Sequence, residues 1–238
     1  QMEKQLLRER VWRELEIRGL VTFPKPARGR IPNFLGSDAA AARLRYLPAY
    51  ESAKVIMVNP DAAQLAVRGA ALRDGKRLLM ASPRLRAGFI MLDPRIIKNH
   101  RKAATIRGAF KLGQEVDIKK GKGDRVVEGS GGVDWEGGRV GKGGGFGDIE
   151  IAILKEVGAI SDTTPIVTTV HELQIVESVP MTEHDVPVNF IVTPERTIEV
   201  ERGYRKPVGI LWELLPSDAF NKMPILGELR ENYDSRRG

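Results

Sequence analysis

The stretch GGRVGKGGGFGDIE, residues 137–150, is dense in glycine and ends on a carboxylate. It follows the apolar run DRVVEGS at 124–130 and leads into DIEIAILKEVGAI at 148–160, which predicts the order strand, glycine loop, helix. A helix N-terminus presents unpaired amide N–H groups, and glycine lets the backbone approach an anion closely. The stretch therefore predicts a phosphate-binding loop, with a flexible surface linker as the alternative.

The candidate phosphate ligands of this loop are backbone amides and two basic side chains. They belong to Arg139, Gly141, Lys142, Gly143, Gly144, Gly145 and Gly147. The loop is not a Walker loop, because Gly143 rather than Ser or Thr follows Lys142, and the G-x-G-x-x-G fingerprint finds no register. Asp148 stands where a phosphate would lie, so it either caps the helix or holds a Mg²⁺ ion that bridges to the phosphates.

Outward from the loop, apolar runs of strand length alternate with helical patterns. The candidate strands are residues 53–60, 77–82, 87–92, 124–130, 165–173, 186–194, 196–201 and 208–215. The candidate helices are residues 3–18, 38–47, 61–75 and 148–160, with residues 93–111 ambiguous and residues 217–238 a tail or a small docking helix. We predict a single α/β domain over residues 1–238, an open three-layer α/β/α fold with a mostly parallel, Rossmann-like sheet.

A second group of polar residues adjoins two of these strands. HELQ follows one strand and EHD precedes another, and residues at strand ends line the ligand crevice of open α/β sheets. The candidate site residues are His171, Glu172, Gln174, His184 and Asp185, each with a capped turn or an exposed polar position as the alternative. His100, in a basic stretch, is expected to be structural.

Composition excludes several classes of site. The absence of cysteine rules out disulfides, thiol catalysis and cysteine-based metal sites, and three scattered histidines argue against a histidine-rich metal site. No apolar run is long enough to span a membrane, and residues 1–15 are too charged for a signal peptide, so we expect a cytoplasmic protein without membrane partners. Scarce Asn and Gln together with absent cysteine are compatible with a thermophile.

Charge is divided unevenly along the chain. Residues 1–125 carry 27 Lys and Arg against 12 Asp and Glu, a net charge of +15, whereas residues 126–238 carry 11 against 19, a net charge of −8. Either the basic first half and the acidic second half attract each other, within a monomer or a homodimer, or the basic half faces a polyanion such as nucleotide phosphates or RNA. Charge alone does not choose between these.

Several motifs resemble the 5-formyltetrahydrofolate cyclo-ligase family. Its members carry an arginine, then Gly-x-Gly-x-Gly-Tyr-Tyr-Asp, a downstream glutamine, a His-Asp pair and a strand that ends in Val-Thr. The similar residues here are Arg139, residues 141–148, Gln174, His184, Asp185, Val192 and Thr193, with Lys4 and Arg8 similar to a Lys/Arg pair used for ATP. The segments FPKPARGRIPNFLG, SPRLRAG, TVHELQIV and VNFIVTPER look like the branch of methenyltetrahydrofolate-synthase-domain-containing proteins, over nearly the whole chain.

The resemblance implies an ATP- and Mg²⁺-dependent ring closure of 5-formyltetrahydrofolate, a folate-like small molecule, to 5,10-methenyltetrahydrofolate. It implies phosphate binding by Lys4, Arg8, the glycine loop and Phe146, with Arg139, Lys142 and Asp148 as the catalytic set and Asp148 as the metal ligand. Substrate contacts would come from Phe146, Gln174 and Asp185, with Phe146 stacking on the pterin or on adenine.

Two departures from the family pattern fall at this expected site. Phe146-Gly147 stands where the family has Tyr-Tyr, and Glu128-Gly129-Ser130 replaces a proline-rich turn. The alternative to a folate enzyme is a non-catalytic relative that binds a nucleotide or RNA through the basic half. Residues 51–125 contain only Phe89 and Phe110 as aromatic residues, which disfavours base stacking on that half.

Overall fold

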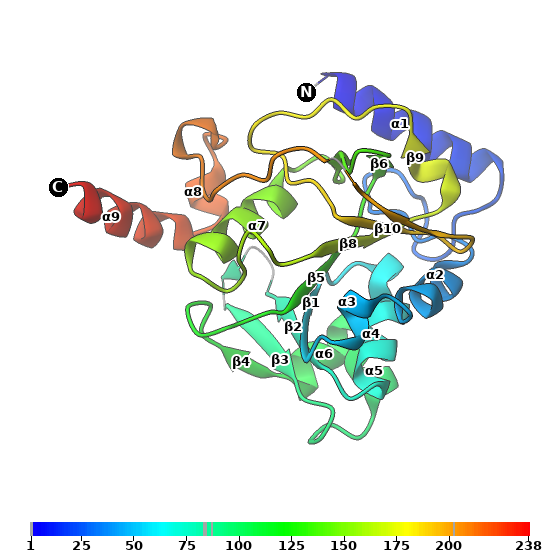
Figure 1. The fold of residues 1–238 in the computed structure, drawn as a ribbon, viewed down its shortest axis with the longest axis horizontal. Coiled ribbons are helices and arrows are strands. Elements are labelled where there is room, and N and C mark those ends of the chain that lie inside the picture. Colours follow the sequence, from blue (N-terminus) through cyan, green and yellow to red (C-terminus); the bar gives the residue numbers. More distant parts are fainter. Residues whose placement is uncertain (1, 83–84, 87, 202) are drawn as a thin grey trace.

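The computed structural model describes residues 2–82, 85–86, 88–201 and 203–238 (Figure 1). These residues form an eight-stranded sheet in the order β11-β10-β8-β5-β1-β2-β3-β4. Its strands are β1 (Val55–Val58), β2 (Arg77–Ala81), β3 (Phe89–Leu92), β4 (Gln114–Val116), β5 (Arg125–Glu128), β8 (Ile166–Thr169), β10 (Phe190–Val192) and β11 (Thr197–Glu199). Neighbours from β10 to β2 run parallel, whereas β3, β4 and β11 join antiparallel at the edges. The predicted mostly parallel sheet is confirmed; Pro83, Arg84 and Ala87 of the SPRLRAG motif lie outside the described residues.

Helices cover both faces of this sheet, which confirms the three-layer prediction. One face carries α2 (Ser37–Leu44), α4 (Leu65–Arg73), α5 (His100–Ala104) and α6 (Ile106–Leu112), with α3 (Pro48–Glu51) beside them. The other face carries α7 (Phe146–Glu156), α8 (Ala219–Lys222) and α9 (Ile225–Arg237). Successive side chains of β1 point to opposite faces of the sheet, so this strand contributes to both hydrophobic cores. Ile56 and Val58 pack in the core on the α4 face, and Val55 and Met57 pack in the core on the α7 face.

The parallel strands β1 and β5 lie side by side in the middle of the sheet, and the strands that follow them are added in opposite directions across it. From β1 the chain continues to β2 on one side, and from β5 it continues to β8 and β10 on the other. The carboxyl ends of β1 and β5 therefore flank a topological switch point, where ligands of open α/β sheets usually bind. Residues 59–61 and 129–131 lie there.

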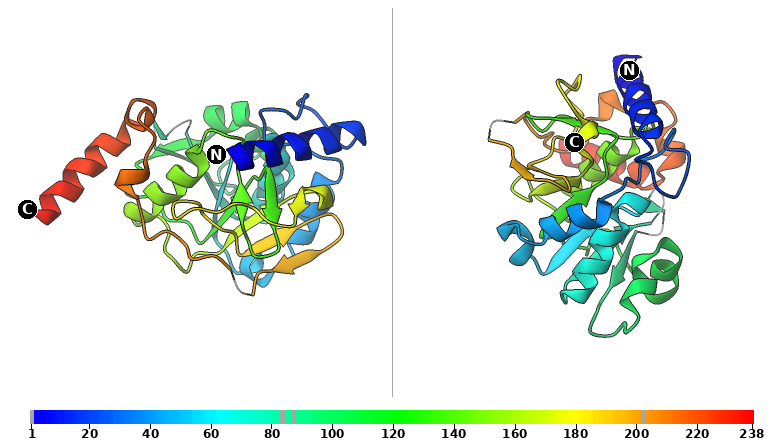
Figure 2. Two further views of the ribbon diagram at one scale, coloured as in Figure 1. Left: turned by 90° about the horizontal axis from the view of Figure 1, so that it is seen from above. Right: turned by 90° about the vertical axis from the view of Figure 1, so that its right-hand side faces the viewer.

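A second, smaller sheet was not predicted from the sequence. Its order is β7-β6-β9, built from β6 (Gly132–Asp134), β7 (Arg139–Val140) and β9 (Ile175–Val176). Helix α1 (Met2–Ile17) packs on this sheet, where Leu7, Val11 and Leu15 share a cluster with Val140 and Val176 (Figure 2). The sheet thus holds α1 beside the glycine-rich segment.

The residues that α1 buries are not the ones that its apolar sequence pattern predicts. Leu6 and Ile17 are exposed, while Lys4 and Arg8 are buried together with apolar residues such as Trp12. Burial of a charged side chain is costly unless it is paired. The buried positions of Lys4 and Arg8 therefore indicate partners on the core side of α1.

The carboxyl-terminal region contains one error of prediction. Residues 208–215 were expected to form a strand, but they form an irregular segment with a short 3₁₀ turn, η4 (Trp212–Leu214). Trp212 stacks on Phe220 at 6.3 Å and packs against Tyr233 at 5.7 Å, so its ring is held by α8 and α9 instead of by a sheet. The far end of α9 projects away from the body of the molecule (Figure 2). Within the described ranges, every helix is too short or too polar to cross a membrane.

Candidate functional site

The glycine run divides between a hairpin and a loop. Residues 137–140 lie in the β6–β7 hairpin, and only residues 141–145 form the loop before α7. Gly143 and Gly145 have φ angles of 127° and 72°, which glycine adopts without the strain that a side chain would add. Gly145 is the N-cap of α7, so the loop leads directly to the free amides of a helix N-terminus.

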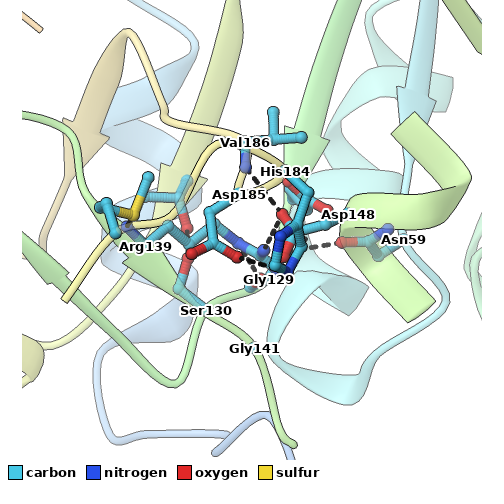
Figure 3. A network of polar contacts seen from close by, with 12 residues as sticks. Asn59, Gly129, Ser130, Arg139, Gly141, Asp148, His184, Asp185 and Val186 are labelled. Atoms are coloured by element: carbon cyan, nitrogen blue, oxygen red, sulfur yellow. Dashed lines mark hydrogen bonds and ion pairs between the residues drawn. The ribbon is translucent and has the colours of Figure 1, made fainter. Parts of the chain in front are cut away.

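Asp148 lies within the first turn of α7 rather than at its cap. Its Oδ1 atom accepts a hydrogen bond from the Val186 amide at 3.0 Å and lies 3.5 Å from Arg139 Nη1 (Figure 3). The N-cap alternative for Asp148 is wrong, because α7 begins at Phe146 with Gly145 as its cap. Burial raises the pKa of Asp148 above its ordinary value, and the charge of Arg139 opposes that rise.

Arg139 is the buried centre of the site. Its Nε and Nη2 atoms donate to the carbonyl oxygen of Gly129 at 3.1 and 2.7 Å. Nη2 also lies 3.5 Å from Glu128 Oε1, so one guanidinium ties the end of β5 to the first turn of α7. Nη1 has no hydrogen-bond partner within the described part of the chain, which leaves one buried donor for a further acceptor.

Helix α1 brings two cations into the site, Lys4 beside Asp185 and Arg8 beside the loop, and ATP binding by this pair stays a prediction. Lys4 Nζ forms a buried 2.5 Å ion pair with Asp185 Oδ2, and Arg8 Nε donates to the Gly141 carbonyl oxygen at 2.9 Å. Burial alone would raise the pKa of Asp185, but hydrogen bonds from Lys4 and Thr182 hold it below its ordinary value. These contacts join α1 to the glycine loop and to the turn at Asp185. Figure 3 shows Asp185 close to Arg139 and Asp148 in the same polar network.

Gln174 lies beneath this network. Its side chain is buried, with Nε2 donating to the carbonyl oxygens of Ser130 at 2.9 Å and Gly131 at 3.3 Å. Its Oε1 atom accepts from the His171 amide at 2.8 Å, within a capping box that starts η3 (Glu172–Gln174). The amide group is thus committed to the backbone after β5, and a substrate contact by Gln174 stays a prediction.

Lys142 and Phe146 occupy the outer part of the loop. Lys142 is exposed, and its charge opposes the upward pKa shifts of Asp61 and Glu150. Phe146 is half-buried at the start of α7, with Lys222 Nζ 5.1 Å from the centre of its ring. Phosphate binding by Lys142 and ring stacking by Phe146 therefore stay predictions.

The remaining polar candidates contact neighbouring protein groups. The pairs are Glu172 with Arg196, His184 with Thr182, and His100 with the carbonyl oxygen of Pro94. Of these residues, only His184 lines a cavity that opens beside the glycine loop. His100 begins α5, which lies at the opposite end of the molecule from α1 (Figure 1). The basic side chains of α5 and α6 are thus remote from the loop, and RNA binding by them stays a prediction.

An acidic group next to Arg139 was not predicted. Glu128 ends β5 and is 1% exposed, and its Oε2 atom has no hydrogen-bond partner within the described ranges. Burial raises the pKa of Glu128 to about 8 and that of Glu150 to about 7, and burial also raises the pKa of Asp61 after β1. The available signal was a carboxylate at the end of the apolar run RVVE, at the carboxyl edge of the sheet.

Glu128 should make the stability of the protein depend on pH. Because its folded pKa of about 8 lies above its ordinary value of 4.5, folding takes up a proton, and the resulting stability is present below pH 4.5 and lost as pH rises toward 8. Glu128→Gln lacks this loss. The free energy of unfolding of Glu128→Gln minus that of wild type should therefore rise by on the order of 2 kcal/mol as pH increases from about 5.5 to about 8.5. Thermal unfolding of both proteins across that range measures the difference.

The control for this comparison is Glu183→Gln, which removes an exposed carboxylate and should leave a curve parallel to that of wild type. Parallel curves for Glu128→Gln and wild type would show that Glu128 is ionised in the folded protein at neutral pH.

A cavity of about 350 Å³ opens beside the loop. The glycine loop, Asp148 and His184 form its polar part, and α7 together with residues 209–216 forms the rest of its wall. Such a volume lies at the lower end of the range of small-molecule sites. The cavity therefore offers room for a ligand whose anionic part rests on the loop.

Comparison with known proteins agrees with the resemblance in the motifs. The sequence model of the 5-formyltetrahydrofolate cyclo-ligase family matches residues 1–194. A methenyltetrahydrofolate synthase domain-containing protein of Mus musculus is 39% identical over 97% of this chain and 64% of its own length. The Homo sapiens protein of the same name is 37% identical over 96% of this chain and 62% of its own length.

The chain thus spans less than two thirds of the length of these relatives. Among solved structures, a 5,10-methenyltetrahydrofolate synthetase of Aquifex aeolicus has the same fold, with a TM-score of 0.54 and 19% identity over 84% of this chain and 94% of that one. The family model matches most of the chain, and the relatives are more than a third identical to it, so the two findings together establish the family. This chain belongs to the 5-formyltetrahydrofolate cyclo-ligase family.

Proposed function

We propose that this chain closes 5-formyltetrahydrofolate to 5,10-methenyltetrahydrofolate at the expense of ATP. The observation that carries the proposal is that Arg8 and Arg139 contact the glycine loop and the first turn of α7, with Lys4 paired to Asp185 in the same network. Phosphoryl transfer needs little besides positioning and stabilisation of charge, and a helix N-terminus with basic side chains beside it supports both.

The reaction requires two bonding steps. The γ-phosphoryl group of ATP passes to the formyl oxygen as its bond to ADP breaks, and N10 then attacks the formyl carbon, losing its proton while phosphate leaves with that oxygen. Arg8 and Lys142 would neutralise the phosphates at the loop. Arg139, fixed by the Gly129 carbonyl oxygen, would hold the loop at a constant distance from β5.

Asp148 is the carboxylate suited to Mg²⁺. It lines the cavity next to the loop, and one carboxylate together with phosphate oxygens and water is a usual environment for this ion. Within the described residues no group of three or more His, Asp or Glu side chains could enclose a metal by itself. This donor set fits a Mg²⁺ ion shared with the nucleotide, whose charge would offset repulsion between Asp148 and the phosphates.

The two departures from the family pattern meet in space. A Cβ atom on Gly147 would lie 3.2 Å from Glu128 Oε1 and 3.4 Å from Arg139 Nη2. The Glu128–Arg139 pair therefore occupies the space beside the loop that a larger side chain at residue 147 would enter. Gly147 thus leaves room for the buried Glu128–Arg139 pair, which supports a formed site despite the departure at Phe146-Gly147.

The test of the proposal is turnover. Purified protein mixed with 5-formyltetrahydrofolate, ATP and Mg²⁺ should produce the absorbance of 5,10-methenyltetrahydrofolate, and omission of ATP should abolish the rise. The expected dependence on ATP follows from the phosphoryl transfer that activates the formyl oxygen. An absent rise with all components present, in protein shown to be folded, would refute the proposed activity.

A further inference from the structure

The cavity beside the glycine loop has one wall outside the segment matched by the family. That wall is residues 209–216, here called the strap, whereas the family match ends at residue 194. The strap includes η4, and it faces Ile149 and Ala152 of α7 across the cavity. The strap therefore adds a wall to the cavity that the family motifs up to residue 194 do not include.

Contacts along α7 hold the strap in place. Lys155 Nζ donates to the Pro207 carbonyl oxygen at 2.6 Å, just before the strap begins. Gly209 approaches α7 so closely that an added Cβ would lie 2.9 Å from Glu156 Oε2. Ile210 is buried in the core that α7 shares with α9. The strap is thus anchored at the carboxyl-terminal part of α7.

The following helix returns toward the start of α7. Lys222 of α8 lies over the ring of Phe146 at 5.1 Å, next to the glycine loop. Trp212 is packed between Phe220 of α8 and Tyr233 of α9, and Arg230 lies 5.3 Å from its ring centre. Aromatic and cation–π contacts therefore fix η4 against the carboxyl-terminal helices.

The chemistry of the cavity changes from one part to the other. Amides of the loop, Asp148 and His184 form the polar part, whereas Leu211, Leu214 and Leu215 of the strap are apolar. Leu214 lines the cavity and is 46% exposed, so its side chain is accessible to a ligand. A ligand with an anionic end and a flat apolar body would match both parts.

We propose that the strap is the binding wall for the purine base of the nucleotide whose phosphates rest on the glycine loop. This inference rests on the proposed function, because it assumes that the loop binds ATP. The pterin of a folate is the other flat ring available, but its row of N–H donors calls for carboxylates. Glu128, Glu150 and Asp61 do not line this cavity, and Asp148 lies at its phosphate end.

Calorimetric titration with two probes tests the assignment, using Mg²⁺-ATP and Mg²⁺-tripolyphosphate, which lacks a base. Leu214→Asp should raise the Kd of ATP about tenfold or more, because an ionised side chain replaces the apolar wall. The Kd of tripolyphosphate should stay within about twofold of wild type, since the loop is unchanged. Val208→Asp is the matched control: residue 208 is 82% exposed, precedes the strap and does not line the cavity.

Ala152→Phe is a second variant that fills the cavity from α7 without adding charge, and it should weaken ATP and spare tripolyphosphate in the same way. Equal loss of both probes would overturn the assignment, because the strap would then act through the loop or the fold. Unchanged ATP affinity in both variants would overturn it as well. Wild-type protein that binds neither probe would instead refute the proposed function.

Discussion

Replacing Arg139 by methionine is expected to lower the free energy of unfolding by about 3–5 kcal/mol, because it leaves a buried carboxylate without its cation. Asp148 would lose its ion-pair partner at 3.5 Å, and the Gly129 carbonyl oxygen would lose both of its donors. Denaturation by urea at neutral pH measures the change. Arg13→Met, at an exposed position of α1, should stay within about 0.5 kcal/mol of wild type.

A second variant distinguishes lost pairing from lost packing at Arg139. In Asp148→Asn/Arg139→Met the stranded carboxylate is gone, so we expect part of the stability to return, with a coupling energy of about 1 kcal/mol or more. Strict additivity of the two substitutions would contradict the central position of Arg139 in this network.

Asp148→Asn is expected to lower kcat by at least about 100-fold, since it removes an ionic group from the phosphoryl-transfer site. Asparagine can keep the acceptor for the Val186 amide, but it removes the negative charge 3.5 Å from buried Arg139, so we also expect a lower free energy of unfolding. Steady-state rates at increasing Mg²⁺ concentration measure the effect, and higher Mg²⁺ should restore part of the activity. Glu183→Gln, a neutralised carboxylate that is exposed in the same region, is the matched control.

Wild-type rates in Asp148→Asn would show that this carboxylate only holds the Val186 amide. Loss of activity together with unchanged dependence on Mg²⁺ would assign Asp148 to the positioning of Arg139 rather than to the metal.

The large elements of the fold could be predicted from sequence, because each carries a pattern longer than a few residues. The buried run at β1 is an example, and β5 and α7 flank the glycine stretch as expected, although β6 and β7 lie between them. The small sheet was missed because β7 has two residues and β6 lies among glycines, so neither offers a period to count. The apolar run at 208–215 was misassigned because Trp212 packs on the aromatic rings of α8 and α9, a tertiary contact that propensity does not encode.

The candidate site was predictable in part for a similar reason. Lys4 and Arg8 resemble a family pair, but their burial became clear only when α1 was placed against the loop. The N-cap alternative for Asp148 could not be decided by sequence, since Gly145 and Asp148 both lie near the start of α7 and both residue types cap helices. The raised pKa of Glu128 depends on complete burial at the end of β5, which one carboxylate in a short apolar run does not reveal.

The most direct test of the central claim is the simultaneous measurement of ADP and 5,10-methenyltetrahydrofolate formed by the wild-type protein. Equal amounts of the two products are expected throughout the reaction, because each ring closure uses one phosphoryl group. ADP formed without the methenyl product, or methenyl product formed without ADP, would contradict the claim that ATP on the glycine loop activates the folate for closure.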